Sequence, residues 1–267
     1  RGELSTELPP EHRQYLNDHA VTDRVIEATG IWSANGEIIF PWTDGDQRTE
    51  QRRPWPGDSG QYYWEEKDLH FWNLRDAGPE SPVLLVEGTK QSLAATGYAP
   101  AEYSVMGMPG CDGWSKCDLS RFADRTVFLA LDADAGTNLS VYEAGDLFRE
   151  EAEFWNTTVR YLWLPARGKA GLDDVLAKKP DAHRGRFVEY LIGKAQAKPA
   201  ERKPQTRKGA RMETILPETG DRIGVAINVD RKDVIDKIVG AMKDKLDGVS
   251  LFNYGDVLTR VQGHETQ

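Results

Sequence analysis

The sequence has few cysteines and no long hydrophobic run, and each absence excludes a class of protein. Its two cysteines, Cys111 and Cys117, have five residues between them and no second pair, which fits neither a zinc ribbon nor a disulfide framework. Free thiols are typical of a reducing cytosol. No apolar stretch approaches the roughly 20 residues that cross a bilayer, so we expect no membrane partner and a cytoplasmic location. The GxxxxGK[ST] phosphate-binding loop is also missing, which argues against a P-loop ATPase in this chain.

The charge is acidic overall but unevenly distributed. A formal net charge of −9 argues against a surface that binds nucleic acid throughout. Residues 194–211 carry seven Lys/Arg and one Glu, so the rest of the chain is near −15. With three Pro or Gly, this basic segment is typical of a solvated linker, which either tethers flexibly or holds DNA electrostatically. The acidic remainder is consistent with a carboxylate cluster that divalent cations would make tolerable.

The middle of the chain, residues 81–193, has the pattern of an α/β domain. Short apolar runs alternate with helix-forming stretches, which is typical of a parallel sheet with helices on both faces. The predicted strands are 83–86, 103–108, 126–131 and 158–164, and the predicted helices are 90–96 and 138–154.

The flanking parts predict smaller α+β units. Residues 1–80 are rich in Trp and Tyr and predict a strand at 36–42, a turn at 43–47 and extended structure at 62–72. After the linker, residues 212–267 predict a strand, a helix over 230–246 capped by Asp230 or Asp233, and a hairpin over 249–261. The first residues lack both an initiator Met and the apolar core of a signal peptide, so we expect a piece of a longer protein.

Carboxylates follow three of the predicted strands. Ligands of α/β sheets bind at the carboxyl ends of strands, and these ends carry the acids Glu87, Asp132, Asp134, Asp173 and Asp174. Each motif alone is more often a turn or a helix cap. Together, on adjacent strands, they predict a site for Mg²⁺ or Mn²⁺, which prefer oxygen ligands and suit phosphoryl-transfer chemistry on nucleotides.

The ordered motifs resemble a known domain. "VLLVEGTKQSLAA" followed by "VFLALDADAGTN" resembles the TOPRIM domain of bacterial-type DNA primases, topoisomerases and a class of nucleases. The resemblance makes Glu87 the glutamate motif, and Asp132 and Asp134 the DxD motif. "KAGLDDVL" is similar to the third acidic motif of the family, a loop ahead of a helix.

Other segments resemble the primase branch. "NGEIIFPWTDGDQRTEQRRPW" and "QYYWEEKDLHFWNLRDA" look like the part of primase catalytic cores that leads into TOPRIM. "DVLTRV" and the helix before it resemble the entry to the helicase half of phage and plasmid primase-helicases. The resemblance usefully covers about residues 20–180.

The resemblance implies metal-dependent primer synthesis on single-stranded DNA. Asp132, Asp134 and Asp173 or Asp174 would hold Mg²⁺ or Mn²⁺ against the phosphates of a nucleoside triphosphate, and a 3′-hydroxyl would attack the α-phosphate. Glu87 would be a further ligand or a general base. The resemblance also implies a replicative helicase domain as a partner on the same full-length chain, and the cytoplasm of a bacterial host as the location.

Two positions depart from the family pattern. Primases carry an Asp four residues after the motif glutamate, where this chain has Gln91, and the first Asp of the third motif aligns with Gly171. The number of metals therefore stays open at this stage.

Contacts to nucleic acid or nucleotide have several candidates. Arg52 and Arg53 suit phosphate recognition, although a solvated pair on a turn explains them equally well. Lys116 is a third candidate, but neither it nor the five histidines forms an informative arrangement. A further group of aromatic residues suits either base stacking or core packing: Trp42, Trp55, Tyr62, Tyr63 and Trp64.

Three functions remain open. The first is a primase core, the second is a TOPRIM nuclease, and the third is a catalytically silent TOPRIM-like module that binds DNA or proteins. The sequence leaves open the initiation sequence, the choice of ribo- or deoxynucleotides, the oligomeric state and the role of the C-terminal unit.

Overall fold

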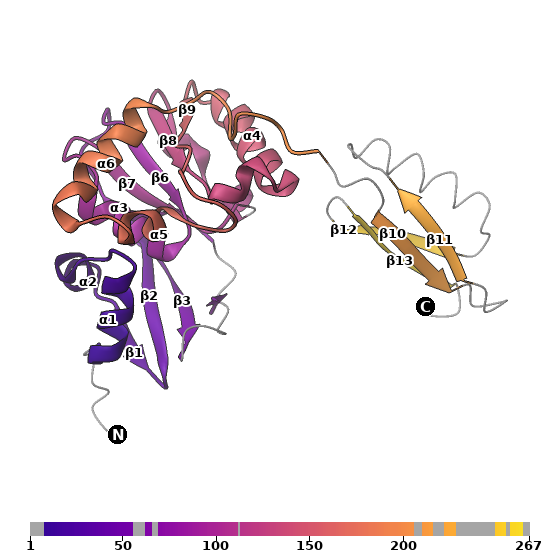
Figure 1. Cartoon of the computed structure of the whole chain (residues 1–267), viewed down its shortest axis with the longest axis horizontal. Coiled ribbons are helices and arrows are strands. Elements are labelled where there is room, and N and C mark those ends of the chain that lie inside the picture. Colours follow the sequence, from indigo (N-terminus) through magenta and orange to yellow (C-terminus); the bar gives the residue numbers. More distant parts are fainter. Residues whose placement is uncertain are drawn as a thin grey trace. The chain divides into compact units, whose positions relative to one another are not determined.

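The chain divides into two compact units in the computed structural model. These are Arg1–Lys203 and Pro204–Gln267, and each is described by itself (Figure 1). The sequence divides an N-terminal part, residues 1–80, from the α/β domain that follows it. In the structure both parts belong to the first compact unit. The structure describes residues 8–55, 62–65, 69–111, 113–205, 210–215, 222–227, 249–254 and 257–263.

The first unit begins with two helices and an antiparallel sheet. The helices are α1 (Pro10–Asp18) and α2 (Asp23–Thr29). The sheet has the order β1-β2-β3-β4, with bounds Trp32–Ala34, Glu37–Asp44, Gln47–Pro54 and Tyr63–Trp64. The predicted strand at 36–42 and the turn at 43–47 are confirmed by the β2–β3 hairpin, where Gly45 has a φ of +57° that suits a tight turn.

A five-stranded sheet forms the centre of this unit, in the order β5-β7-β6-β8-β9. The strands are β5 (Trp72–Arg75), β6 (Val83–Glu87), β7 (Ser104–Met108), β8 (Thr126–Ala130) and β9 (Thr158–Tyr161). The last four are mutually parallel, as predicted, but β5 pairs antiparallel with β7. The four predicted strands are therefore confirmed as parallel, and the sheet is mixed because β5, which the pattern did not include, borders it as an antiparallel edge strand.

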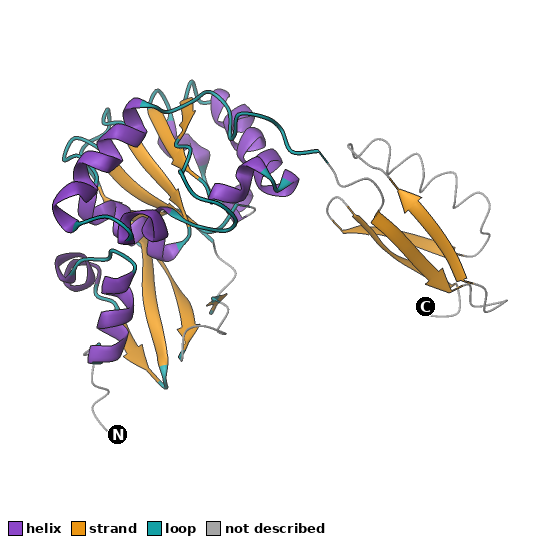
Figure 2. Cartoon of the chain, viewed as in Figure 1, coloured by secondary structure: helices purple, strands orange, loops and turns teal. Residues whose placement is uncertain are grey.

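Helices cover both faces of the central sheet (Figure 2). Leu84 and Val86 of β6 pack in one core cluster with residues of α3 (Thr89–Tyr98), α5 (Leu172–Ala177) and α6 (Asp181–Gly193). Val83 and Leu85 pack in the second cluster, with α4 (Leu139–Glu153). Successive side chains of a strand point to opposite faces, so both faces of β6 are buried. The α/β class and the two helical layers are confirmed.

Part of the predicted basic linker packs on the first unit. Gln196 pairs with Tyr161 of β9 through backbone hydrogen bonds. Ala200 is buried, and Lys203 lies 2.6 Å from a carboxylate oxygen of Glu143 on α4. Residues up to Lys203 therefore belong to the first unit, and the boundary between the units falls inside the segment 194–211.

The second unit contains two antiparallel strand pairs among its described residues. They are β10 (Ala210–Ile215) with β11 (Arg222–Ile227), and β12 (Val249–Tyr254) with β13 (Val257–Gly263). The predicted hairpin over 249–261 is confirmed. The predicted helix over 230–246 and its caps, Asp230 or Asp233, lie outside the described residues.

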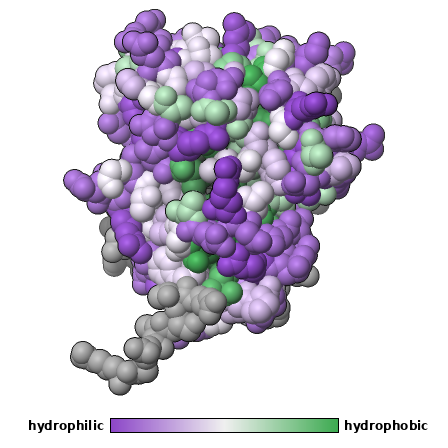
Figure 3. Space-filling model, turned by 90° about the vertical axis from the view of Figure 1, so that its left-hand side faces the viewer, coloured by the Kyte–Doolittle hydropathy of each residue, from purple (hydrophilic) through white to green (hydrophobic). Residues whose placement is uncertain are grey.

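The surface is largely polar where it can be seen. Figure 3 shows one face on which hydrophilic residues predominate and hydrophobic ones emerge only in small areas between them. Within the described parts of the chain, no helix has the length and hydrophobicity needed to cross a bilayer.

Candidate metal centre

Glu87 joins the ends of two neighbouring strands. It is the last residue of β6, and Gly88 behind it turns the chain with a φ of +77°. The Glu87 carboxylate accepts hydrogen bonds from the backbone N–H of Asp132, after β8, at 3.3 Å and of Cys111, after β7, at 3.2 Å. Burial and the nearby Asp132 raise the pKa of Glu87 to about 7. The side chain is thus held at the carboxyl edge of the sheet, as predicted.

Asp134 lies within the 3₁₀ turn η3 (Ala133–Gly136), and Asp132 is the residue directly before this turn. Burial raises the pKa of Asp132 to about 6, with added repulsion from Asp134, Asp173 and Asp174. Asp134 is 7% exposed; its Oδ2 accepts from Asn138 at 3.1 Å, while its buried Oδ1 has no partner among the described residues. A buried carboxylate oxygen without a donor is costly unless something compensates it, so this atom suits a cation.

Asp173 and Asp174 begin α5 and serve the helix as well as the site. Asp174 Oδ2 accepts from the backbone N–H of Gly171 at 3.1 Å, which completes a cap of the helix. Asp173 is 2% exposed, and its Oδ2 lies 3.5 Å from Lys90 Nζ. Burial raises the pKa of Asp173, against the opposing effect of Lys90. Within the third acidic motif, one oxygen of Asp173 and one of Asp174 thus already have partners in the protein.

His19 is a neighbour of this motif that the sequence did not identify. One ligand atom each of His19, Asp173 and Asp174 lie within 4.8 Å of one another, the one such trio of His, Cys, Asp or Glu in the described residues. His19 Nδ1 lies 2.8 Å from the carbonyl oxygen of Tyr15, which leaves Nε2 as the remaining ring nitrogen. His19 follows α1, more than 150 positions before Asp173, so no sequence spacing signals the contact.

The predicted acids therefore fall into two groups. Glu87, Asp132 and Asp134 form the group at the ends of β6 and β8, and Asp173 and Asp174 form the other at the start of α5. Mutual charge effects on the pKa of Asp132 connect the two groups. Gln91 also connects them, because its side chain contacts both Asp132 and the backbone of Leu172.

The basic candidates are engaged within the fold, apart from Lys116. Arg52 forms ion pairs with Glu37, Glu50 and Glu65 at 3.5, 3.0 and 2.8 Å. Arg53 is 8% exposed, with its guanidinium 4.8 and 4.9 Å from the ring centres of Tyr15 and Tyr62. Phosphate binding by either arginine would require these contacts to change.

Lys116 ends the 3₁₀ turn η1 (Gly113–Lys116) and is exposed. No contact described above links Lys116 to the acidic groups. Its role in binding nucleic acid therefore stays a prediction.

The aromatic cluster of the N-terminal part is mainly core. Trp42 is fully buried, with its ring 5.2 Å from Trp72 and 4.8 Å from Trp64. Tyr63 is 42% exposed, but its hydroxyl donates to Glu37 at 2.5 Å. Packing accounts for Trp42, and base stacking by it is excluded in this structure because no face of its ring is accessible.

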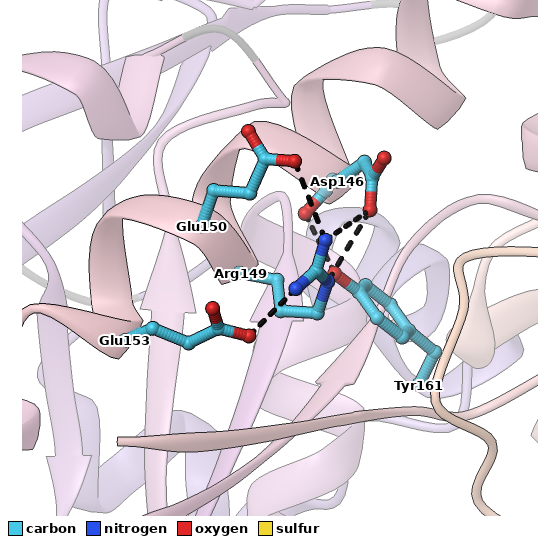
Figure 4. A network of polar contacts seen from close by, with 6 residues as sticks. Asp146, Arg149, Glu150, Glu153 and Tyr161 are labelled. Carbon is cyan, nitrogen blue, oxygen red and sulfur yellow. Dashed lines mark hydrogen bonds and ion pairs between the residues drawn. The ribbon is translucent and has the colours of Figure 1, made fainter. Parts of the chain in front are cut away.

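Another acidic cluster, on α4, is compensated by its own cation. Arg149 donates to Asp146 at 2.9 Å and Glu153 at 2.6 Å, and lies 3.4 Å from Glu150 (Figure 4). Tyr161 lies beside this network and donates to the carbonyl of Gly145 at 2.7 Å. Because one guanidinium already compensates the charge of these carboxylates, the α4 cluster has less need of a metal than the group formed by Glu87, Asp132 and Asp134.

The raised pKa of Glu87 predicts a pH-dependent effect of its replacement. Between 4.5, the ordinary value, and about 7, the folded state keeps a proton that the unfolded state loses, so this group lowers stability as pH rises. Glu87→Gln is therefore expected to stabilise the metal-free protein above pH 7 by on the order of 1–3 kcal/mol relative to its effect below pH 4.5. Thermal unfolding of both proteins in a chelator measures this; a pH-independent difference would contradict it.

Comparison with known proteins leaves the family open, because no family model, no curated protein and no solved structure matches this chain.

Proposed function

We propose that this chain is a TOPRIM-type catalytic core that synthesises short primers on single-stranded DNA by metal-dependent nucleotidyl transfer. The observation that carries the proposal is the junction at Glu87, where one carboxylate accepts from the backbone of Asp132 at the neighbouring strand end. The parallel strands β6 and β8 are adjacent, so their carboxyl ends bring Glu87 and the Asp132–Asp134 turn to one edge. The motif resemblance supplies the reaction class.

The donor set fits a hard divalent cation. Glu87, Asp132 and Asp134 offer only oxygen, and the buried Asp134 Oδ1 has no other partner among the described residues. These three carboxylates are not a tight trio, but Mg²⁺ commonly binds through one or two carboxylates and keeps several waters. When bound, Mg²⁺ or Mn²⁺ would neutralise triphosphate charge and favour the ionised form of a 3′-hydroxyl.

The chain's own residues would hold and orient these partners. Asp132 and Asp134 are the principal ligands in this proposal, because their turn directly follows a buried strand that fixes its position. Glu87 is held by two backbone N–H groups and has a pKa of about 7, so it can carry or release a proton near neutrality. Single-stranded DNA, nucleoside triphosphates and a helicase domain on a longer chain are the proposed partners.

A catalytically silent binding module is the second candidate. It is favoured by the contacts of Lys90 with Asp173 and of Gln91 with Asp132, which occupy carboxylate oxygens that would otherwise be available to a metal. The TOPRIM nuclease has no specific structural observation in its favour.

The test incubates the protein with single-stranded template, ribonucleotides and Mg²⁺ or Mn²⁺, and examines labelled products by size. Short oligonucleotides that depend on template support the proposal. Shortened template indicates the nuclease. If neither appears, also with flanking segments restored, the binding module remains and primer synthesis is rejected.

A further inference from the structure

The side chain of Gln91 connects the two acidic groups of the candidate metal centre. Its Nε2 donates to Asp132 Oδ1 at 2.6 Å, and its Oε1 accepts from the backbone N–H of Leu172 at 2.9 Å. Leu172 is the first residue of α5, directly before Asp173 and Asp174. One amide therefore contacts both the Asp132 carboxylate at the end of β8 and the first turn of α5, which begins 40 residues after Asp132.

The chemistry of the two partners determines how the amide is oriented. An ionised carboxylate only accepts hydrogen bonds, and a backbone N–H only donates. A reversed amide would face Asp132 with its oxygen and Leu172 with its NH₂ group, so both hydrogen bonds would be lost. An acidic side chain at this position cannot reproduce both contacts while ionised, because it would face Asp132 with a like charge. An uncharged amide of this length serves both partners at once.

Gly171 provides the space that the amide occupies. A Cβ at this position would overlap the side-chain amide of Gln91 and lie 2.6 Å from Asp173 Oδ1. The φ of Gly171 is −91°, so the backbone conformation itself does not demand glycine. The need for glycine is therefore steric and arises from both Gln91 and Asp173. Gln91 and Gly171, the two departures from the family pattern, are thus matched in space.

We infer that Gln91 is a positioning residue, which sets the separation of Asp132 from the Asp173–Asp174 turn and presents Asp132 to the cation through its other oxygen, with Gly171 as its required neighbour. This inference rests on the proposed metal site. The amide occupies Asp132 Oδ1, so Oδ2 is the oxygen left for a ligand. Where a side chain holds a metal-binding carboxylate by a hydrogen bond in this way, loss of that bond typically lowers metal affinity about 10- to 100-fold.

The experiment measures Mn²⁺ affinity by electron paramagnetic resonance and thermal stability in a chelator. Gln91→Ala and Gly171→Ala are each expected to weaken Mn²⁺ binding about 10- to 100-fold. The double variant is expected to lose less affinity than the sum of the two single effects, because both substitutions displace the same amide, while the methyl group added at position 171 also meets Asp173. The matched control is Gln14→Ala, whose side chain donates to Asp18 at 2.7 Å on the exposed surface of α1; its Mn²⁺ affinity is expected to equal that of the unmodified protein.

Each outcome decides the inference. Singles that weaken Mn²⁺ binding with a non-additive double support it. Variants that melt earlier yet bind Mn²⁺ as the unmodified protein does show a merely structural residue and overturn it, as do strictly additive effects. If the unmodified protein binds Mn²⁺ but makes no oligonucleotides, the proposed primer synthesis fails while the inference stands. If it binds no Mn²⁺, both fail.

Discussion

Asp132→Asn is expected to reduce oligonucleotide synthesis by at least about 10²-fold, the scale of losing one preorganised charge-stabilising group. Asparagine keeps the size of the side chain and can still accept the hydrogen bond from Gln91 Nε2. It removes the negative charge, so it weakens binding of a divalent cation. The folded chain should survive, because burial and the neighbouring acids already disfavour ionised Asp132 and raise its pKa to about 6. Template-directed assays and thermal unfolding of the same protein preparations measure the two effects separately.

Asp46→Asn is the matched control for this prediction. Asp46 lies exposed in the turn between β2 and β3 and undergoes the same chemical change. It is expected to leave both synthesis and melting temperature unchanged. Full activity of Asp132→Asn with an unchanged melting temperature would remove Asp132 from the metal site, and equal losses in both variants would show that charge at large, not this carboxylate, is responsible.

The acids at the strand ends could be predicted because they depend on local pattern and one general rule. Four short apolar runs with helices between them predict adjacent parallel strands, and the structure has β7, β6, β8 and β9 in that arrangement. Carboxyl ends of such strands share one edge. Glu87 and Asp132 could therefore be placed together without knowledge of any contact. The antiparallel edge strand β5 (Trp72–Arg75) begins at the end of the predicted extended segment 62–72. Its sequence does not indicate whether it runs parallel or antiparallel to its neighbour, so its place in the sheet could not be predicted.

The groups that compensate the acids could not be predicted, because they come from distant parts of the chain. Lys90 and Gln91 were within a predicted helix, but only the packing of α3 beside α5 brings them to Asp173 and Leu172. His19, directly after α1, reaches the same place. Side-chain partners of this kind depend on how distant helices pack together, and the composition and periodicity of a short segment do not predict that packing.

The linker and the arginines also have partners that residue type alone does not predict. Basic composition predicted a solvated segment, yet Lys198 accepts through its carbonyl from Trp163 Nε1 at 2.8 Å and Pro199 lies against Gly145. Arg52 is a candidate phosphate contact from its residue type, and in the structure it pairs with Glu37 and Glu50 of the N-terminal sheet and with Glu65 just after it. Residue type indicates what a side chain can bind and leaves open which partner is close.

Lys90→Met is expected to destabilise the metal-free protein by about 3–5 kcal/mol at pH 8, the usual effect of leaving one member of a buried ion pair alone. Asp173 is almost fully buried, and the Lys90 ammonium, 3.5 Å from its Oδ2, is its ion-pair partner. Burial already raises the pKa of Asp173, and loss of Lys90 would raise it further. Protonation would then relieve the uncompensated charge, so the destabilisation should shrink as pH falls toward 5. Denaturant unfolding at the two pH values measures the difference.

A divalent cation should recover part of this loss, because Lys90→Met leaves the ligand atoms of His19, Asp173 and Asp174 within 4.8 Å of one another without an ammonium beside them. Mn²⁺, which accepts both oxygen and imidazole ligands, is therefore expected to raise the melting temperature of Lys90→Met more than that of the unmodified protein. Lys203→Met is the matched control, since Lys203 pairs with Glu143 at 2.6 Å but is 52% exposed. An exposed pair of this kind contributes only about 0–1 kcal/mol. Equal destabilisation of the two variants would mean that Lys90 does not compensate Asp173, and the third acidic motif would then be available to a metal in the unmodified chain.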